Sequence, residues 1–105
     1  MSNFSYEEKQ PGQLSITGEL TIYDAAQLKD LLLERLHANQ SLEVDLSGVI
    51  ELDSSGVQIM LLIQREATLS EKNVKWLQHS QAVSQVLDVL NLGRTLGEPV
   101  SLVWS

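Results

Sequence analysis

The apolar residues of the chain follow two periods, which together predict alternating strands and helices. Alternation at period two over Leu14–Gly18 and again over Leu42–Leu46 predicts strands with one buried face. Shorter apolar segments predict three further strands, at Phe4–Lys9, Val74–Leu77 and Val100–Trp104. Residues 10–13 predict a hairpin turn directly after the strand Phe4–Lys9, because proline presets φ and glycine tolerates positive φ.

Three segments have the period of a helix. Leu28, Leu32 and Leu36 form an apolar stripe after Asp24, which we expect to cap that helix. The segment Val57–Ser70 lacks proline and glycine, and Ser80 is expected to cap a third helix that ends at Leu92-Gly93. The second helix is apolar on more than one side in its first turns, which indicates deep burial or a side offered to a partner: Val57, Ile59, Met60, Leu61, Leu62, Ile63.

This order of elements predicts an α/β fold, with a single-layer mixed β-sheet of four to five strands and interspersed helices. The chain has 105 residues, a size typical of one compact domain, and we expect residues 1–105 to form a single domain with one core. Hydrophobic residues make up 43% of the chain and aromatic residues only 5%, so the core should be aliphatic.

Composition and charge exclude several classes of function. The sequence has no cysteine, and His37 and His79 lie far apart, so we expect no metal site and no cofactor. A formal charge of −7 with scattered basic residues disfavours nucleic-acid binding. The longest apolar run, Ile59–Ile63, is too short for membrane insertion, and the first residues lack a secretory signal, so a cytoplasmic location is expected.

The segment Gly48–Gly56, predicted to be a loop, carries the candidate chemistry. It ends in Asp53, Ser54, Ser55 and Gly56, directly before the second helix. A helix amino terminus has unpaired N–H groups and a partial positive charge, so a hydroxyl there is accessible and a phosphate on it is tolerated. A serine at this position is also an ordinary helix cap, and the local sequence alone favours that alternative.

The central segment resembles the STAS domain family, of the anti-sigma factor antagonist type. The resemblance is carried by the Val-Asp-Leu-Ser strand at residues 44–47, the Asp-Ser-Ser-Gly motif at residues 53–56 and the apolar helix that follows. Residues 18–20, Gly-Glu-Leu, and the segment Val83–Gly93 extend the resemblance to nearly the whole chain. One position differs, because Thr21 stands where the family commonly has an aspartate.

The resemblance implies a regulatory switch that binds proteins and is controlled by serine phosphorylation. A serine kinase of the anti-sigma type would phosphorylate Ser54 and an opposing phosphatase would reset it. Asp53 would position the phosphoacceptor, Ser55 would cap the helix, and Gly56 would let the loop enter the helix. We expect a monomer when free, with a partner surface on the loop and the first helical turns: Gly48, Val49, Glu51, Val57, Gln58.

Two other classes of function compete with this one. The first is a constitutive STAS subunit that docks to a transporter ATPase or a signalling complex without being phosphorylated. The second is an enzyme, for which the sequence offers no thiol nucleophile, no glycine-rich phosphate loop and no histidine-containing triad. Asp53 has no evident catalytic partner, so we expect no catalytic residue and no enzymatic activity.

Overall fold

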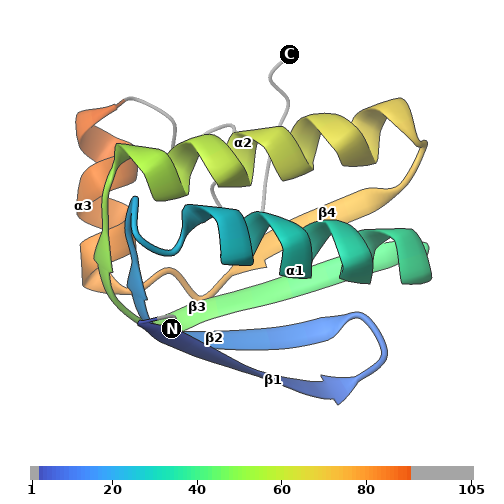
Figure 1. Ribbon diagram of the computed structural model, residues 1–105, viewed down its shortest axis with the longest axis horizontal. Coiled ribbons are helices and arrows are strands. Elements are labelled where there is room, and N and C mark those ends of the chain that lie inside the picture. The colour runs from blue at the N-terminus through green and yellow to red at the C-terminus, as the bar shows by residue number, and fades with distance from the viewer. Residues whose placement is uncertain (1–2, 91–105) are drawn as a thin grey trace.

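The computed structural model describes residues 3–90, which form a mixed four-stranded sheet with two long helices on one face (Figure 1). Strands β1 (Phe4–Gln10), β2 (Gln13–Leu20), β3 (Ser41–Leu52) and β4 (Asn73–Leu77) lie side by side in that order. The helices are α1 (Ala25–Ala38), α2 (Ser54–Leu69) and α3 (Gln81–Val89). The predicted α/β class and mixed sheet are confirmed, whereas the predicted strand Val100–Trp104 and the Leu92-Gly93 helix end lie outside the described residues.

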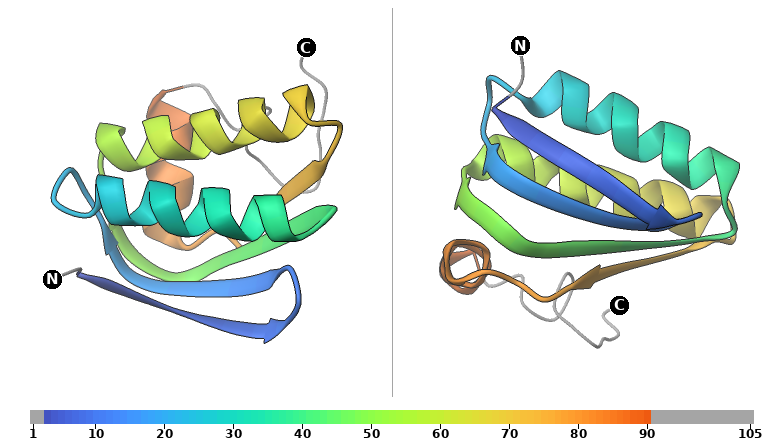
Figure 2. Two further views of the ribbon diagram at one scale, coloured as in Figure 1. Left: turned by 45° about the vertical axis from the view of Figure 1, so that its right-hand side comes forward. Right: turned by 90° about the horizontal axis from the view of Figure 1, so that it is seen from below.

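The helices occupy two places around the sheet. Helices α1 and α2 pack against each other over the same face, whereas α3 lies beside the end of β3 that leads into α2 (Figure 2). Strand β4 pairs only with the first half of β3, over Ser41–Asp45. The second half of β3 is therefore free of β4, and within residues 3–90 it is α3 that contacts β3 beside its carboxyl end.

The hairpin between β1 and β2 depends on a glycine. These strands are antiparallel, and Gly12 in the turn has a φ of +85°, which residues with a side chain rarely adopt. A Cβ on Gly12 would also lie 2.6 Å from the Ser41 carbonyl oxygen. The Gly12 carbonyl accepts a hydrogen bond from the Glu43 N–H at 2.7 Å, which ties the turn to the start of β3. The predicted hairpin is confirmed.

Strand β3 is longer than the predicted strand because it contains two irregularities. It pairs with β2 in parallel, and twice it places one more residue than β2 between consecutive pairs: between Ser15↔Asp45 and Thr17↔Gly48, and between Gly18↔Val49 and Glu19↔Glu51. The second extra residue is Ile50. At each bulge the alternation of side chains is displaced by one residue, and beyond the bulge it continues with a period of two. Leu46, Val49 and Leu52 are consequently all buried, although their spacing is three.

The same pairing sets two carboxylates opposite each other. Glu19 on β2 and Glu51 on β3 are paired residues on adjacent strands, so their side chains project to the same side of the sheet. Their neighbours Leu20 and Leu52 point the other way and are buried. The β2–β3 pair thus presents acidic side chains away from α1 and α2.

The core is aliphatic, as predicted, with Trp76 of β4 as its buried aromatic residue. Helix α2 contacts both the sheet and α1, so more than one of its faces is used for packing. Its residues Val57, Met60 and Ile63 are buried, and Ile59, Leu61 and Leu62 are partly buried against the core. The apolar surplus of this helix is therefore explained by packing within the fold, and none of these six side chains is left exposed.

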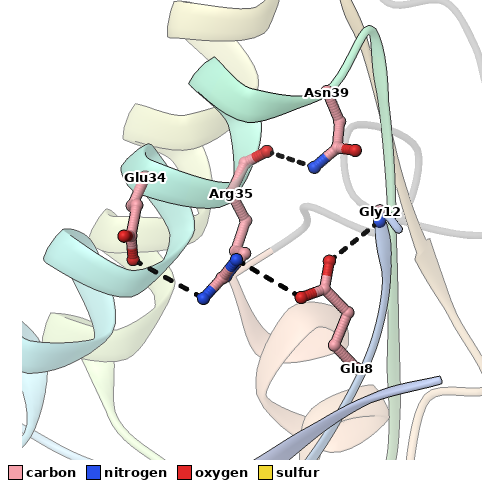
Figure 3. Close-up of polar contacts among 5 residues, drawn as sticks. All are labelled: Glu8, Gly12, Glu34, Arg35 and Asn39. Atoms are coloured by element: carbon pink, nitrogen blue, oxygen red, sulfur yellow. Dashed lines mark hydrogen bonds and ion pairs between the residues drawn. The ribbon is translucent and has the colours of Figure 1, made fainter. Parts of the chain in front are cut away.

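A charged cluster ties α1 to the first hairpin (Figure 3). The Arg35 guanidinium on α1 lies 3.3 Å from one carboxylate oxygen of Glu8 on β1, and the other oxygen accepts the Gly12 N–H at 3.0 Å. Glu34 lies 3.8 Å from the same guanidinium, and Asn39 donates its side-chain amide to the Arg35 carbonyl at 2.8 Å. Both carboxylate oxygens of Glu8 therefore have a partner, one in Arg35 and the other in the Gly12 N–H.

The carboxyl end of α1 is closed by a lysine from a distant part of the chain. The Lys72 ammonium, just before β4, donates to the Leu36 carbonyl at 2.7 Å and to the His37 carbonyl at 3.1 Å. These carbonyls belong to the last turn of the helix, where the partial charge is negative, and the Leu36 carbonyl also accepts the Asn39 N–H at 3.3 Å. Lys72 thus joins the end of α1 to the start of β4.

We expect Lys72→Met to lower the free energy of unfolding by about 1 kcal/mol, because two helix carbonyls lose a charged donor. Denaturant unfolding measures the loss. Lys29→Met removes an exposed lysine from α1 and serves as the matched control, with an expected change within about 0.5 kcal/mol. Equal losses for the two variants would show that the Lys72 bonds contribute nothing specific.

Candidate functional site

The candidate site lies where the carboxyl ends of β2 and β3 meet. Because these strands are parallel and pair up to Leu20↔Leu52, the chain leaves both of them at the same edge of the sheet. The Asp53 N–H donates to the Leu20 carbonyl at 3.2 Å, which continues the pairing one step beyond β3. The β2–α1 loop and the start of α2 are therefore neighbours, although about 30 residues separate them in the sequence.

The Asp53 carboxylate joins these two segments. One oxygen accepts the Gly56 N–H at 3.1 Å and caps α2, and the other accepts the Ile22 N–H of the β2–α1 loop at 2.9 Å. Asp53 is thus the cap of this helix, and the prediction that Ser55 caps it is wrong. Both Asp53 oxygens are engaged by backbone donors, which orients the carboxylate beside Ser54.

Ser54 is the first residue of α2, and its side chain is exposed. Ser55 follows within the first turn and is partly buried. Gly56 is buried, and a Cβ there would lie 2.6 Å from both the Leu20 carbonyl oxygen and a methyl group of Leu52. Close approach of α2 to the end of β2 thus explains this glycine. Of the two serines, Ser54 is the one that solvent and a second protein can reach.

The structure corrects part of the predicted partner surface. Gly48, Val49 and Glu51 belong to β3, because the two bulges prolong the strand to Leu52 and leave only Asp53 between β3 and α2. Val49 and Val57 are buried in the core, so neither is available to a partner in this conformation. Glu51 and Gln58 are exposed, and Gly48 is partly exposed, so these three can still contribute to a surface.

Three exposed apolar residues lie on the segments that meet at this site, and the sequence alone did not single them out. Ile22 and Tyr23 form the β2–α1 loop and are 65% and 84% exposed, and Ile50, the bulge residue, is 70% exposed. The signal for Ile22 and Tyr23 was their position directly after a strand. This position points to the site only once β2 is known to pair in parallel with β3, the strand that leads to Ser54.

Asp24 holds this loop from beneath. It stands at the cap position of α1, but its side chain makes no cap bond, so the predicted capping role is wrong. The fully buried carboxylate instead accepts the Asn3 N–H at 2.6 Å and the Thr21 hydroxyl at 3.2 Å. Burial alone would raise the pKa of Asp24, but the bonds from Asn3 and Thr21 outweigh it and hold that pKa below its ordinary value.

Thr21 gains its role from this arrangement. Its hydroxyl and its N–H both face one Asp24 oxygen, at 3.2 and 3.4 Å, and the residue is buried. Thr21 therefore does not present a side chain to the surface at the point where the sequence departs from the family pattern. The residues that follow it, Ile22 and Tyr23, are the exposed ones.

Neither a metal centre nor a membrane span is found in the part of the chain that the structure describes. Among residues 3–90, no group of three or more His, Asp or Glu side chains is placed to hold a metal ion. Within the same residues, no helix combines the length and the apolar character needed to cross a bilayer.

The family described as "Mlab, STAS domain" matches residues 5–103. The chain therefore belongs to the STAS domain family, and the resemblance seen in the sequence is confirmed. Among curated proteins, none matches the chain significantly.

Solved structures share the fold at low sequence identity. SpoIIAA, an anti-sigma factor antagonist in its unphosphorylated form, superposes with a TM-score of 0.69 at 23% identity, covering 86% of this chain and 82% of that one. An anti-sigma factor antagonist from Mycobacterium paratuberculosis gives 0.76 at 21%, covering 89% and 82%. The Bacillus cell fate determinant SpoIIAA in its phosphorylated form gives 0.65 at 22%, covering 86% and 85%.

We expect Asp53→Ala to lower the free energy of unfolding by about 1–2 kcal/mol, because it removes the α2 cap and the bond to Ile22 together. Asp53→Asn should cost less, since asparagine also caps helices, but it replaces one of the two acceptor oxygens by an amide. Hydrogen exchange separates the two bonds: in Asp53→Asn the Ile22 amide should exchange faster while the Gly56 amide stays protected. Unchanged exchange at Ile22 would contradict the bridging role.

The buried Asp24 should make stability depend on pH. A carboxylate whose folded pKa is lowered contributes stability above its unfolded pKa, and this contribution is lost as the pH falls through the folded pKa. At neutral pH, Asp24→Asn should cost about 1–3 kcal/mol, because a buried acceptor is lost. In unfolding measurements, the gap between wild type and variant should be constant from pH 7 down to about pH 4, near the unfolded pKa, and should narrow as the pH falls further toward 3. A gap that is constant over the whole range would mean that Asp24 does not titrate in this way.

Proposed function

We propose that this STAS domain is a regulatory protein-binding switch of the anti-sigma factor antagonist type, controlled by phosphorylation of Ser54. The observation that carries the proposal is the position of Ser54, exposed at the start of α2 beside a carboxylate that joins two segments. The exposed apolar side chains of Ile22 and Tyr23 belong to the loop that Asp53 holds in place. A chargeable hydroxyl beside an apolar loop is suited to switching a protein contact.

The electrostatics of the site favour control of binding over control of folding. A phosphate on Ser54 adds a charge of about −1.5 to −2 and three acceptor oxygens. The helix amino terminus stabilises that charge, because the first N–H groups of α2 and the helix dipole point toward it. A partner docked over Ser54 meets the bulk and the charge directly. Affinity would therefore fall without a rearrangement of the sheet or of α2.

The related structures support this view. SpoIIAA has been solved in both an unphosphorylated and a phosphorylated form, and both superpose on this chain over most of its length. A fold of this kind thus accepts a phosphate and keeps its architecture. For the present chain, the proposal includes a serine kinase of the anti-sigma type, an opposing phosphatase, a cytoplasmic location, a monomeric free state and no catalytic activity of its own.

A second candidate function is constitutive docking to a transporter ATPase or a signalling complex without phosphorylation. One observation favours it: the exposed Ile22 and Tyr23 offer an apolar contact that does not require Ser54 to change state. The two functions differ in a single measurable property, namely whether a cognate kinase modifies Ser54.

We expect the cognate serine kinase and ATP to add one phosphate at Ser54, located by peptide mapping and abolished by Ser54→Ala. Ser54→Asp should weaken binding to the kinase at least tenfold, about 1.4 kcal/mol, because a carboxylate is hostile in a docked interface. Its melting temperature should change little, since negative charge suits a helix start. Calorimetric titration and thermal melting measure the two quantities.

Ser55→Ala is the matched control, because it removes the neighbouring hydroxyl and should leave phosphorylation intact. Phosphate found on Ser55 would place the acceptor one residue away from the proposed one. A chain that binds its partner with equal affinity as Ser54→Ala and Ser54→Asp, and that no kinase modifies, would favour constitutive docking.

A further inference from the structure

A second surface lies between the edge strand β1 and helix α1. A shallow groove of about 650 Å³ runs between them, on the side of the sheet that carries the helices. Phe4, Tyr6 and Leu31 supply its apolar lining, and Asp30 and Glu34 of α1 supply its charge. None of these residues belongs to the Ser54 site.

The groove borders an open sheet edge. Within residues 3–90, β1 pairs with β2 on one side and with no strand on the other. The outer N–H and C=O groups of an edge strand are a template for an added strand. The paired positions Tyr6↔Ile16 and Glu8↔Leu14 show that alternate β1 residues point to the helix side, where the groove lies. An added strand would send every second side chain into the groove.

The charge of the groove is only partly neutralised from within the fold. Glu8 is compensated by Arg35 at 3.3 Å and by the Gly12 N–H, as Figure 3 shows. Glu34 lies farther from the same guanidinium, at 3.8 Å, and keeps most of its side chain in solvent. For Asp30, one turn earlier on α1, no salt bridge within 4.0 Å occurs among the described residues. The two carboxylates therefore leave a net negative rim beside the apolar lining.

This charge selects the kind of occupant. A second copy of the chain pairing through β1 would bring two acidic edges together, each with Glu7 and Glu8, in a protein whose formal charge is −7. Like charges on facing strands are destabilising, and charged residues on an edge protect it from self-pairing. A cationic segment has the opposite effect, because it meets an acidic rim and an apolar lining together.

We propose that this groove binds an extended Lys- or Arg-bearing segment of a partner protein, added as a strand along the outer edge of β1 beside Tyr6 and Glu8. An apolar side chain of the segment packs on Phe4, Tyr6 and Leu31. The side chain two residues along carries the positive charge to Asp30 and Glu34, because residues i and i+2 of a strand share a face. Backbone hydrogen bonds to β1 set the register, and the apolar lining and the acidic rim of the groove supply specificity.

The probe is the peptide acetyl-Thr-Val-Thr-Lys-Thr-Val-Thr-amide, titrated into the full-length, isotope-labelled chain by NMR. Amide shifts should change over β1 and along the groove side of α1, and intermolecular contacts to Tyr6 should appear. The double variant Asp30→Asn with Glu34→Gln should bind the peptide about five- to tenfold more weakly, because two partly exposed ion pairs are lost. Replacement of the peptide lysine by glutamate should abolish binding.

Two control variants make the outcome decisive. Asp88→Asn removes an exposed carboxylate from α3 and should bind as wild type does. Ser54→Asp should also bind the peptide as wild type does, so failure of the groove proposal can be distinguished from failure of the phosphorylation proposal. The proposal is overturned if shifts map to the acidic outer sheet face around Glu51, or if the double variant binds equally well. It is also overturned if β1 shifts depend on protein concentration alone, which would indicate a second copy.

Discussion

The parallel pairing of β2 with β3 is the constraint on which the site depends. It brings the ends of two strands to one edge of the sheet, where the Asp53 N–H continues the ladder to the Leu20 carbonyl. From there the Asp53 carboxylate reaches the Ile22 N–H and the start of α2. The close approach that Gly56 permits follows from the same pairing. A change that separates β2 from β3 would thus dismantle the loop, the cap and the surroundings of Ser54 together.

The arrangement around Asp53 also explains how a small chemical change could act without moving the fold. Both oxygens of this carboxylate are held by backbone donors on opposite sides, and Asp24 holds the same loop from below through Asn3 and Thr21. The exposed Ile22 and Tyr23 therefore sit on an anchored loop. Binding to such a preorganised surface costs little ordering entropy, so its affinity is sensitive to charge placed beside it.

Local patterns predicted most of the fold because the strands and helices repeat their own periods. The hairpin, the mixed sheet, the three helices and the cap at Ser80 all follow from residues close together in the chain. The second half of β3 was missed because two bulges break its alternation. Val49 and Leu52 are both buried although they are three residues apart, whereas a regular strand buries every second residue. A bulge is a property of pairing and cannot be seen in one strand alone.

The same distinction applies to the site. Ser54 and Asp53 could be located from sequence, since a helix start is a local feature. The contact of Asp53 with Ile22 spans 31 residues and that of Asp24 with Asn3 spans 21, so no window of sequence reveals them. The burial of Val57 likewise depends on the position of α2 over the sheet and beside α1.

The facing positions of Glu19 and Glu51 have a consequence for the stability of the free domain. Like charges directly opposite each other on adjacent strands are destabilising, so this pair weakens the sheet most at low salt, where screening is weak. A cation brought near the pair would offset that loss.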